Sequence, residues 1–229
     1  MLQAGKKQDL IMVKEVGFGI YLAEGENASE RVLLPAKEVP EGTKQGDELT
    51  VFLYRDSQDR LIATLREPAM ELGGLAVLRV AEVGKVGAFL DWGLEKDLML
   101  PFREQTRKVR QDEEVLVALY LDTSSRLCGT MNVYEYLECQ SPYQKDDRVT
   151  GRIYEISEEF GVFVAVDDRY SGLIPKKEAA GRYRIGDIAE FRVTGVKPDG
   201  KLDLSSREKK EQQMDADAIC IMRVIDEYE

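Results

Sequence analysis

Hydrophobic and polar positions recur along this chain in the same order three times. Each copy begins with an aliphatic, β-branched run, continues through a glycine-aromatic segment, and reaches a short apolar segment that ends in proline. A polar loop, another apolar run, a turn and a last alternating segment complete the copy. The glycine-aromatic segments read EVGFGIYLAE (15–24), KVGAFLDWG (85–93) and EFGVFVAVD (159–167). Because chance does not keep such an order three times, the pattern indicates a tandem repeat.

The pattern within each copy predicts five short strands, bounded by Gly, Asp, Ser and Pro. An open five-stranded sheet would leave unpaired edges, whereas a closed barrel removes them. The central glycine suits a sharp bend of a barrel strand, and Pro35, Pro101 and Pro175 suit the start of a one-turn helix. The sequence therefore predicts an all-β chain of three tandem five-stranded OB-fold barrels.

These landmarks set the expected domain limits. We expect barrels over residues 1–66, 67–144 and 145–206, followed by a short C-terminal helix within 207–229. Ile219, Met222 and Ile225 repeat at the spacing of one face of an amphipathic helix. Trp92 fits a buried or an exposed position equally well.

Composition narrows the function classes. The chain is 43% hydrophobic and 33% charged, and none of its apolar runs reaches the roughly 18 residues that cross a bilayer. We expect no signal peptide and no membrane partner, and the three scattered cysteines favour a reducing, cytoplasmic setting. The absence of histidine excludes Ser-His-Asp or Cys-His nucleophiles and histidine-ligated zinc. We therefore expect neither a metal nor a cofactor.

The third copy, with FGVFV, GLIP, GD and DGKLDLS in order, resembles the S1-type RNA-binding domain. The first copy matches that motif moderately and the second loosely. A three-copy chain followed by MDADAICIMRVIDEY is similar to the bacterial conserved virulence factor B family, which carries a winged helix after its barrels. Residues 207–229 are too few for a whole winged helix, so we expect an incomplete one. Either the chain is truncated, or its C-terminal helix packs on a barrel or on a partner.

The resemblance implies which residues contact RNA. OB folds bind single strands through aromatic platforms and basic groups on one face. The motif places Phe160 and Phe163 there in the third copy, Phe18 and Tyr21 in the first, and Phe89 in the second, where Val86 replaces the other platform. Aromatic residues on strands are more often core than ligand platforms, so the motif match carries this prediction. The proline that ends each apolar segment replaces the family's usual histidine, which removes one polar contact.

Basic residues extend the prediction. The family's basic residue after the last turn maps to Arg60, Arg126 and Lys201, while Lys197 replaces the acidic companion found at Asp56 and Asp122. In the third copy, the loop after the proline carries Lys176, Lys177, Arg182 and Arg184. Each cluster also suits a solvated loop, but a loop that borders the binding cleft is where phosphates would lie.

Three classes of function remain to be separated. The first is a non-catalytic protein that holds single-stranded RNA across its barrels, in post-transcriptional or virulence-related gene regulation as the family resemblance implies. The second is a protein-interaction scaffold of degenerate barrels, using the acidic surface or the C-terminal helix, which the formal charge of −11 favours. The third, a metal-dependent enzyme, lacks a clustered carboxylate motif. We favour the first class because the aromatic residues match the motif of an RNA-binding domain.

Overall fold

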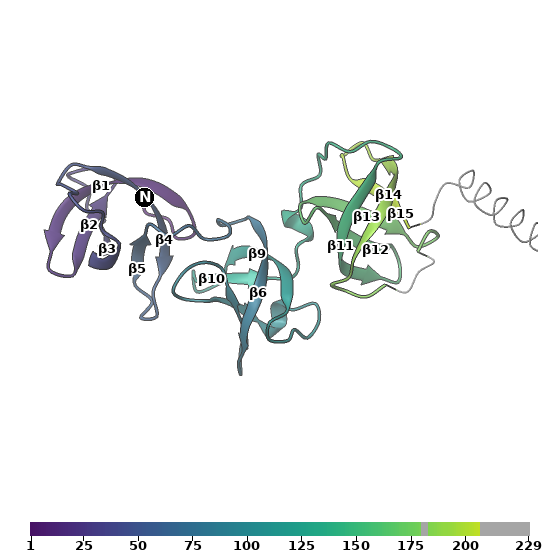
Figure 1. The fold of residues 1–229 in the computed structure, drawn as a ribbon, viewed down its shortest axis with the longest axis horizontal. Helices are drawn as coiled ribbons and strands as arrows, with labels where there is room; N and C mark the ends of the chain where they lie inside the picture. Colours follow the sequence, from purple (N-terminus) through teal and green to yellow (C-terminus); the bar gives the residue numbers. More distant parts are fainter. Residues whose placement is uncertain (180–182, 207–229) are drawn as a thin grey trace, which may run out of the picture. The chain divides into compact units, whose positions relative to one another are not determined.

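The computed structural model describes residues 1–179 and 183–206, and within them the chain forms three closed five-stranded barrels (Figure 1). Barrel 1 comprises β1 (Lys7–Val16), β2 (Gly19–Ala23), β3 (Val32–Pro35), β4 (Glu48–Arg55) and β5 (Leu61–Thr64). Barrel 2 comprises β6 (Leu75–Val83), β7 (Gly87–Asp91), β8 (Leu98–Pro101), β9 (Glu114–Leu121) and β10 (Leu127–Thr130). Barrel 3 comprises β11 (Arg148–Ser157), β12 (Gly161–Val166), β13 (Tyr170–Pro175), β14 (Ile188–Val196) and β15 (Leu202–Ser205).

All three barrels share one topology. In barrel 1 the strand order is β1-β2-β3-β5-β4, with β3 and β5 parallel and the other pairs antiparallel, and barrels 2 and 3 repeat it. The first strand of each barrel carries a bulge near its middle, between Met12 and Lys14 in barrel 1. A bulge bends a strand and lets it pair with both of its neighbours in a closed barrel. The predicted all-β class with three OB-fold barrels is confirmed.

The alternation of side chains builds the cores. In barrel 3, Val162, Val164 and Val166 point inward from β12 and pack against Phe191 and Leu204. Barrel 1 encloses an equivalent cluster that includes Leu10, Leu22 and Leu53. Burying each such side chain contributes about 1.5–3 kcal/mol to the free energy of folding. These clusters therefore stabilise the barrels that enclose them.

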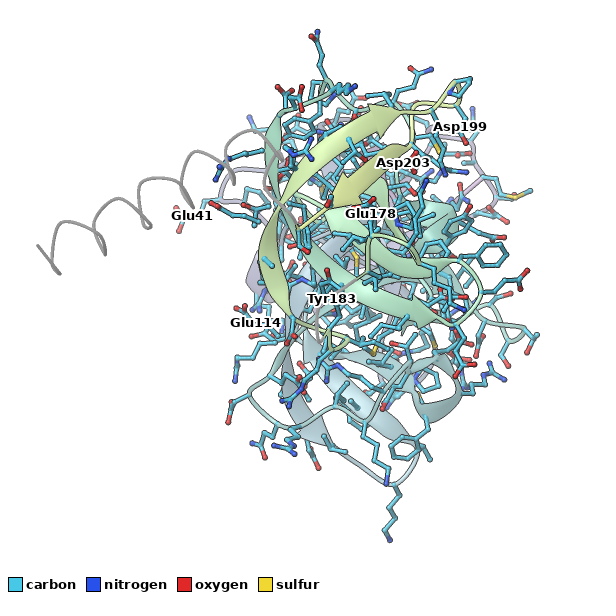
Figure 2. The ribbon with its side chains drawn as sticks, turned by 90° about the vertical axis from the view of Figure 1, so that its right-hand side faces the viewer. Glu41, Glu114, Glu178, Tyr183, Asp199 and Asp203 are labelled. Carbon is cyan, nitrogen blue, oxygen red and sulfur yellow. The ribbon has the colours of Figure 1, made fainter. Side chains whose placement is uncertain are left out.

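In each barrel, a glutamate forms the same hydrogen bond to the last strand. It lies three residues after the proline that ends the third strand, in 3-10 helices Ala36–Glu38 and Phe102–Glu104 and in a turn in barrel 3. Its carboxylate accepts a hydrogen bond from a hydroxyl at the end of the last strand. The donor–acceptor pairs are Thr64–Glu38 at 2.5 Å, Thr130–Glu104 at 2.8 Å and Ser205–Glu178 at 3.3 Å (Figure 2 labels Glu178). This repeated latch joins the strand-three connection to the last strand.

Barrels 1 and 2 pack into one compact unit, Met1–Tyr136. Phe52 and Tyr54 point outward from β4 of barrel 1 and belong to the same apolar cluster as the core of barrel 2. The ring of Phe52 meets Trp92 edge-on with centroids 5.9 Å apart, and the indole N–H donates to the Lys96 carbonyl at 2.7 Å. Trp92 is therefore buried, which settles a position that the sequence left open.

The second compact unit begins at Leu137 and contains barrel 3. The backbone of Glu138 bonds to Arg169 and Ser171, so the segment that precedes β11 runs beside β13. Tyr143 donates a hydrogen bond to the Asp167 carboxylate, and this bond raises the pKa of Tyr143 to about 12. The domain limits expected from the sequence stay predictions.

A 3-10 helix at Tyr134–Tyr136 precedes the second unit, and no helix among residues 1–179 and 183–206 has the length and apolarity to span a bilayer. The predicted C-terminal helix and incomplete winged helix in 207–229 lie outside the described residues.

Candidate nucleic-acid interface

Barrel 3 carries a connected set of aromatic rings on its outer surface. Phe160, in the turn before β12, is 56% exposed, and Phe163 faces outward because its neighbours Val162 and Val164 fill the core. The centroids of Phe160 and Phe163 lie 6.4 Å apart with the rings at 67°. The ring of Tyr154, which is buried, has its centroid 6.1 Å from that of Phe163. The structure therefore brings the two predicted platform residues together.

The backbone fixes the position of Phe160. Gly161 pairs with Pro175 across β12 and β13, and the N–H of Lys176 donates to the Phe160 carbonyl at 3.1 Å. A Cβ on Gly161 would lie 2.1 Å from the carbonyl oxygen of Ile174, so only glycine allows the strands to approach this closely. Glycine is thus required by strand contact, a more specific reason than the bend expected from the sequence.

The other two barrels repeat this corner. Ala36 donates to the carbonyl of Phe18 at 3.0 Å in barrel 1, and Phe102 donates to the carbonyl of Val86 at 3.4 Å in barrel 2. Phe18 is 61% exposed, and Tyr21 is half-buried. Phe102, which is 50% exposed, was missed by the sequence reasoning. The signal that could have found it is an aromatic residue directly after the proline, where Lys176 stands in barrel 3.

Positive charge lies beside the aromatic corner of barrel 3. Lys176 and Lys177 follow β13 directly, both are exposed, and within the part of the chain that the structure describes neither forms an ion pair. Arg184 is exposed in the following loop, where its backbone N–H donates to Asp187 at 3.1 Å. Arg182 lies outside the described residues. The two lysines therefore have ammonium groups available for phosphate.

The basic residues of the last turns are differently placed, because carboxylates already hold them. Arg60 bonds through Nη2 to Asp56 at 2.7 Å, and Lys201 pairs with Asp199 at 3.1 Å. Lys197 pairs with Asp203 at 3.4 Å (Figure 2 labels Asp199 and Asp203). Arg126 of barrel 2 pairs with Asp59 of barrel 1 at 3.3 Å. Contact between these four basic residues and RNA stays a prediction, in which each would exchange a carboxylate for a phosphate.

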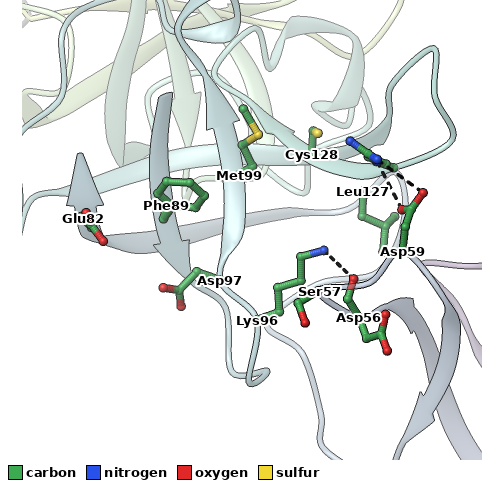
Figure 3. A pocket seen from close by; sticks show the side chains of 11 residues that line it. Asp56, Ser57, Asp59, Glu82, Phe89, Lys96, Asp97, Met99, Leu127 and Cys128 are labelled. Atoms are coloured by element: carbon green, nitrogen blue, oxygen red, sulfur yellow. Dashed lines mark hydrogen bonds and ion pairs between the residues drawn. The ribbon is translucent and has the colours of Figure 1, made fainter. Parts of the chain in front are cut away.

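In barrel 2 the predicted platform residue Phe89 borders a cleft of about 430 Å³ (Figure 3). Phe89, Met99 and Cys128 are neighbours on β7, β8 and β10 and form part of its lining. Burial raises the pKa of Cys128 to about 11, so its thiol stays protonated at neutral pH. No cluster of three or more potential metal ligands occurs within residues 1–179 and 183–206.

Comparison with known proteins places these features in a family. Residues 4–66 and 72–132 match the S1 domain family, and residues 135–208 match the family described as the second domain of virulence regulatory factor CvfB. The S1 matches thus fall on barrels 1 and 2, although the motif itself is best kept in barrel 3.

Related chains match over most of their length. The uncharacterized protein YitL of Bacillus subtilis is 30% identical over 96% of this chain and 76% of its own. Conserved virulence factor B of Staphylococcus haemolyticus is 24% identical over 91% of this chain and 73% of its own.

A crystal structure of a multidomain protein with nucleic acid binding domains from Streptococcus pneumoniae shares the fold. Its TM-score is 0.57 at 20% identity, covering 92% of this chain and 78% of that one. The three barrels, the repeated glycine-aromatic corner and the sequence matches lead to one assignment: the chain belongs to the S1 domain family and is a CvfB-like member of it.

Proposed function

We propose that this chain binds single-stranded RNA without catalysing a reaction, and that barrel 3 is its principal site. The observation that carries the proposal is the exposed ring of Phe160, set against Phe163 and beside Lys176. Aromatic rings next to available cations suit a strand of RNA, because bases stack on the rings while phosphates meet the ammonium groups. The nucleic acid binding domains named for the S. pneumoniae protein support the same class of ligand.

The biological setting follows from the family. We infer a role in post-transcriptional or virulence-related gene regulation, and the relative named conserved virulence factor B supports the link to virulence. Additional barrels on one chain can raise the affinity for a long RNA through linkage, without any new kind of contact.

Replacing Phe160 with alanine tests the proposal with little risk to the fold, since this ring is 56% exposed. A stacked base contributes about 1–3 kcal/mol, so Phe160→Ala should weaken binding of a short unstructured RNA about 5- to 150-fold. Fluorescence anisotropy of labelled RNA measures the affinity, and thermal unfolding checks that the variant remains folded.

Phe18→Ala is the matched control, because Phe18 occupies the same corner of barrel 1 and is 61% exposed. We expect a smaller loss for this variant. Equal affinity of Phe160→Ala and the wild type would exclude barrel 3 as the main site. A protein-interaction scaffold would instead show no salt-dependent RNA binding in any of these chains.

A further inference from the structure

The cleft of barrel 2 lies where that barrel would meet a nucleic acid. Phe89 on β7 faces Met99 on β8, just as Phe163 on β12 faces Leu173 on β13 in barrel 3. Phe89 and Met99 both line the cleft. The cleft is therefore the counterpart in barrel 2 of the aromatic face of barrel 3.

The opposite wall of this cleft is the β4–β5 turn of barrel 1, which contributes Asp56, Ser57 and Asp59 (Figure 3). This turn engages both basic side chains that line the cleft. The Lys96 ammonium donates to the Asp56 carbonyl at 2.9 Å, and the guanidinium of Arg126 donates to the two carboxylate oxygens of Asp59 at 3.3 and 3.4 Å. The donors that an RNA phosphate would use are thus bound to acceptors of the same chain.

The other charged residues that line the cleft are acidic. Glu82 lies in register with Phe89 on the neighbouring strand, and Asp97 completes the lining. Burial, followed by the negative charge of Asp91, raises the pKa of Asp97. While Arg126 and Lys96 are engaged, a phosphate entering here would meet carboxylates and no available cation among the lining residues.

We propose that the β4–β5 turn of barrel 1 is an internal competitor for the RNA face of barrel 2, with the Asp59 carboxylate bound where Arg126 would otherwise hold a phosphate. This inference rests on the proposed RNA-binding function. The competing ion pair is weak, because the side chains of Arg126 and Asp59 are 58% and 46% exposed. An RNA already held by another part of the chain would be concentrated enough to displace it.

The variant Asp59→Asn removes the charge and keeps the turn, since asparagine tolerates the positive φ of 64° at this position. Asp112→Asn is the matched control. Asp112 has a φ of 62° and pairs with Arg79 at 3.0 Å, but it does not line the cleft. Both variants therefore lose one carboxylate from an exposed ion pair in the same unit.

Residue-resolved NMR of the full chain, titrated with a ten-nucleotide oligouridine at low salt, measures binding at each barrel separately. In Asp59→Asn the signals of the Phe89 ring and Arg126 Nε–H should report binding about 2- to 5-fold tighter than in the wild type. Asp112→Asn should match the wild type. The gain should vanish when Asp59→Asn is introduced into an Arg126→Gln chain, because the competitor then has nothing to release.

Two results would overturn the inference. One is equal affinity at Phe89 in the wild type and in Asp59→Asn. The other is a gain that persists in the Arg126→Gln background, which would show that Asp59 only repels RNA at a distance. The Phe160 and Phe163 signals report on barrel 3 independently. If they do not respond while Phe89 does so in Asp59→Asn, the proposed site in barrel 3 fails and the competition at barrel 2 stands.

Discussion

Gly161 links the fold of barrel 3 to its proposed site, and Gly161→Ala tests that link. The new Cβ would lie 2.1 Å from the carbonyl oxygen of Ile174 and 2.7 Å from the amide nitrogen of Lys176. Both atoms belong to the backbone, so no side chain can rotate away to make room. Relief of the clash requires the end of β13 to move away from β12.

The expected cost has two parts. The backbone at Gly161 has a φ of +125°, which an alanine adopts only with strain of about 1–3 kcal/mol. Separating the strands also breaks the bond from the Lys176 N–H to the Phe160 carbonyl, which contributes about 0.5–1.5 kcal/mol. We therefore expect Gly161→Ala to lower the free energy of unfolding of barrel 3 by about 2–4 kcal/mol.

Urea denaturation measures this loss, and RNA affinity should fall with it because Phe160 and Lys176 lose their common support. Gly195→Ala is the control in the same barrel. Nothing lies within 4 Å of the Cβ position at Gly195, so this change should be nearly neutral. If Gly161→Ala costs less than about 1 kcal/mol, the close approach is not what requires glycine here.

Two further predictions concern charge. Replacing Lys176 and Lys177 by glutamine should flatten the slope of log affinity against log salt by about 0.7 for each phosphate that is no longer neutralised, and an unchanged slope would place the phosphates elsewhere. Tyr143→Phe should destabilise the chain near neutral pH. Asp167 raises the pKa of Tyr143 from 10.0 to about 12. The free energy of unfolding, measured by urea denaturation, should therefore differ between wild type and variant below pH 10, and the difference should shrink toward pH 12. A constant difference would contradict this.

The sequence predicted the fold because the repeat exposes period-two alternation and turn residues at matching places. Val162 and Val164 indicate an inward face, and the three prolines mark where each third strand ends. The latch formed by Glu38, Glu104 and Glu178 was missed, although it too recurs at a fixed distance after proline. An acidic residue in a polar loop gives no local signal of a partner 26 or 27 residues away along the chain.

The site was harder to predict, because exposure and pairing depend on contacts between distant segments. Phe160 and Phe163 follow from a local motif, and the structure places their rings together. Arg126 shows the limit of the motif. Its partner Asp59 is 67 residues away in another barrel, and no spacing rule relates the two.

The outward-facing residues distinguish the three barrels more than their shared cores do. Phe52 and Tyr54 of barrel 1 are buried against barrel 2, and Arg126 of barrel 2 is held by a turn of barrel 1, so unit 1 uses these residues for internal packing. Barrel 3 has Lys176 beside its exposed Phe160, where barrels 1 and 2 have Ala36 and Phe102 after the proline. Under the proposed function, one barrel sets the affinity for short RNA. Barrel 2 then raises the affinity further only when a longer RNA displaces Asp59 from Arg126.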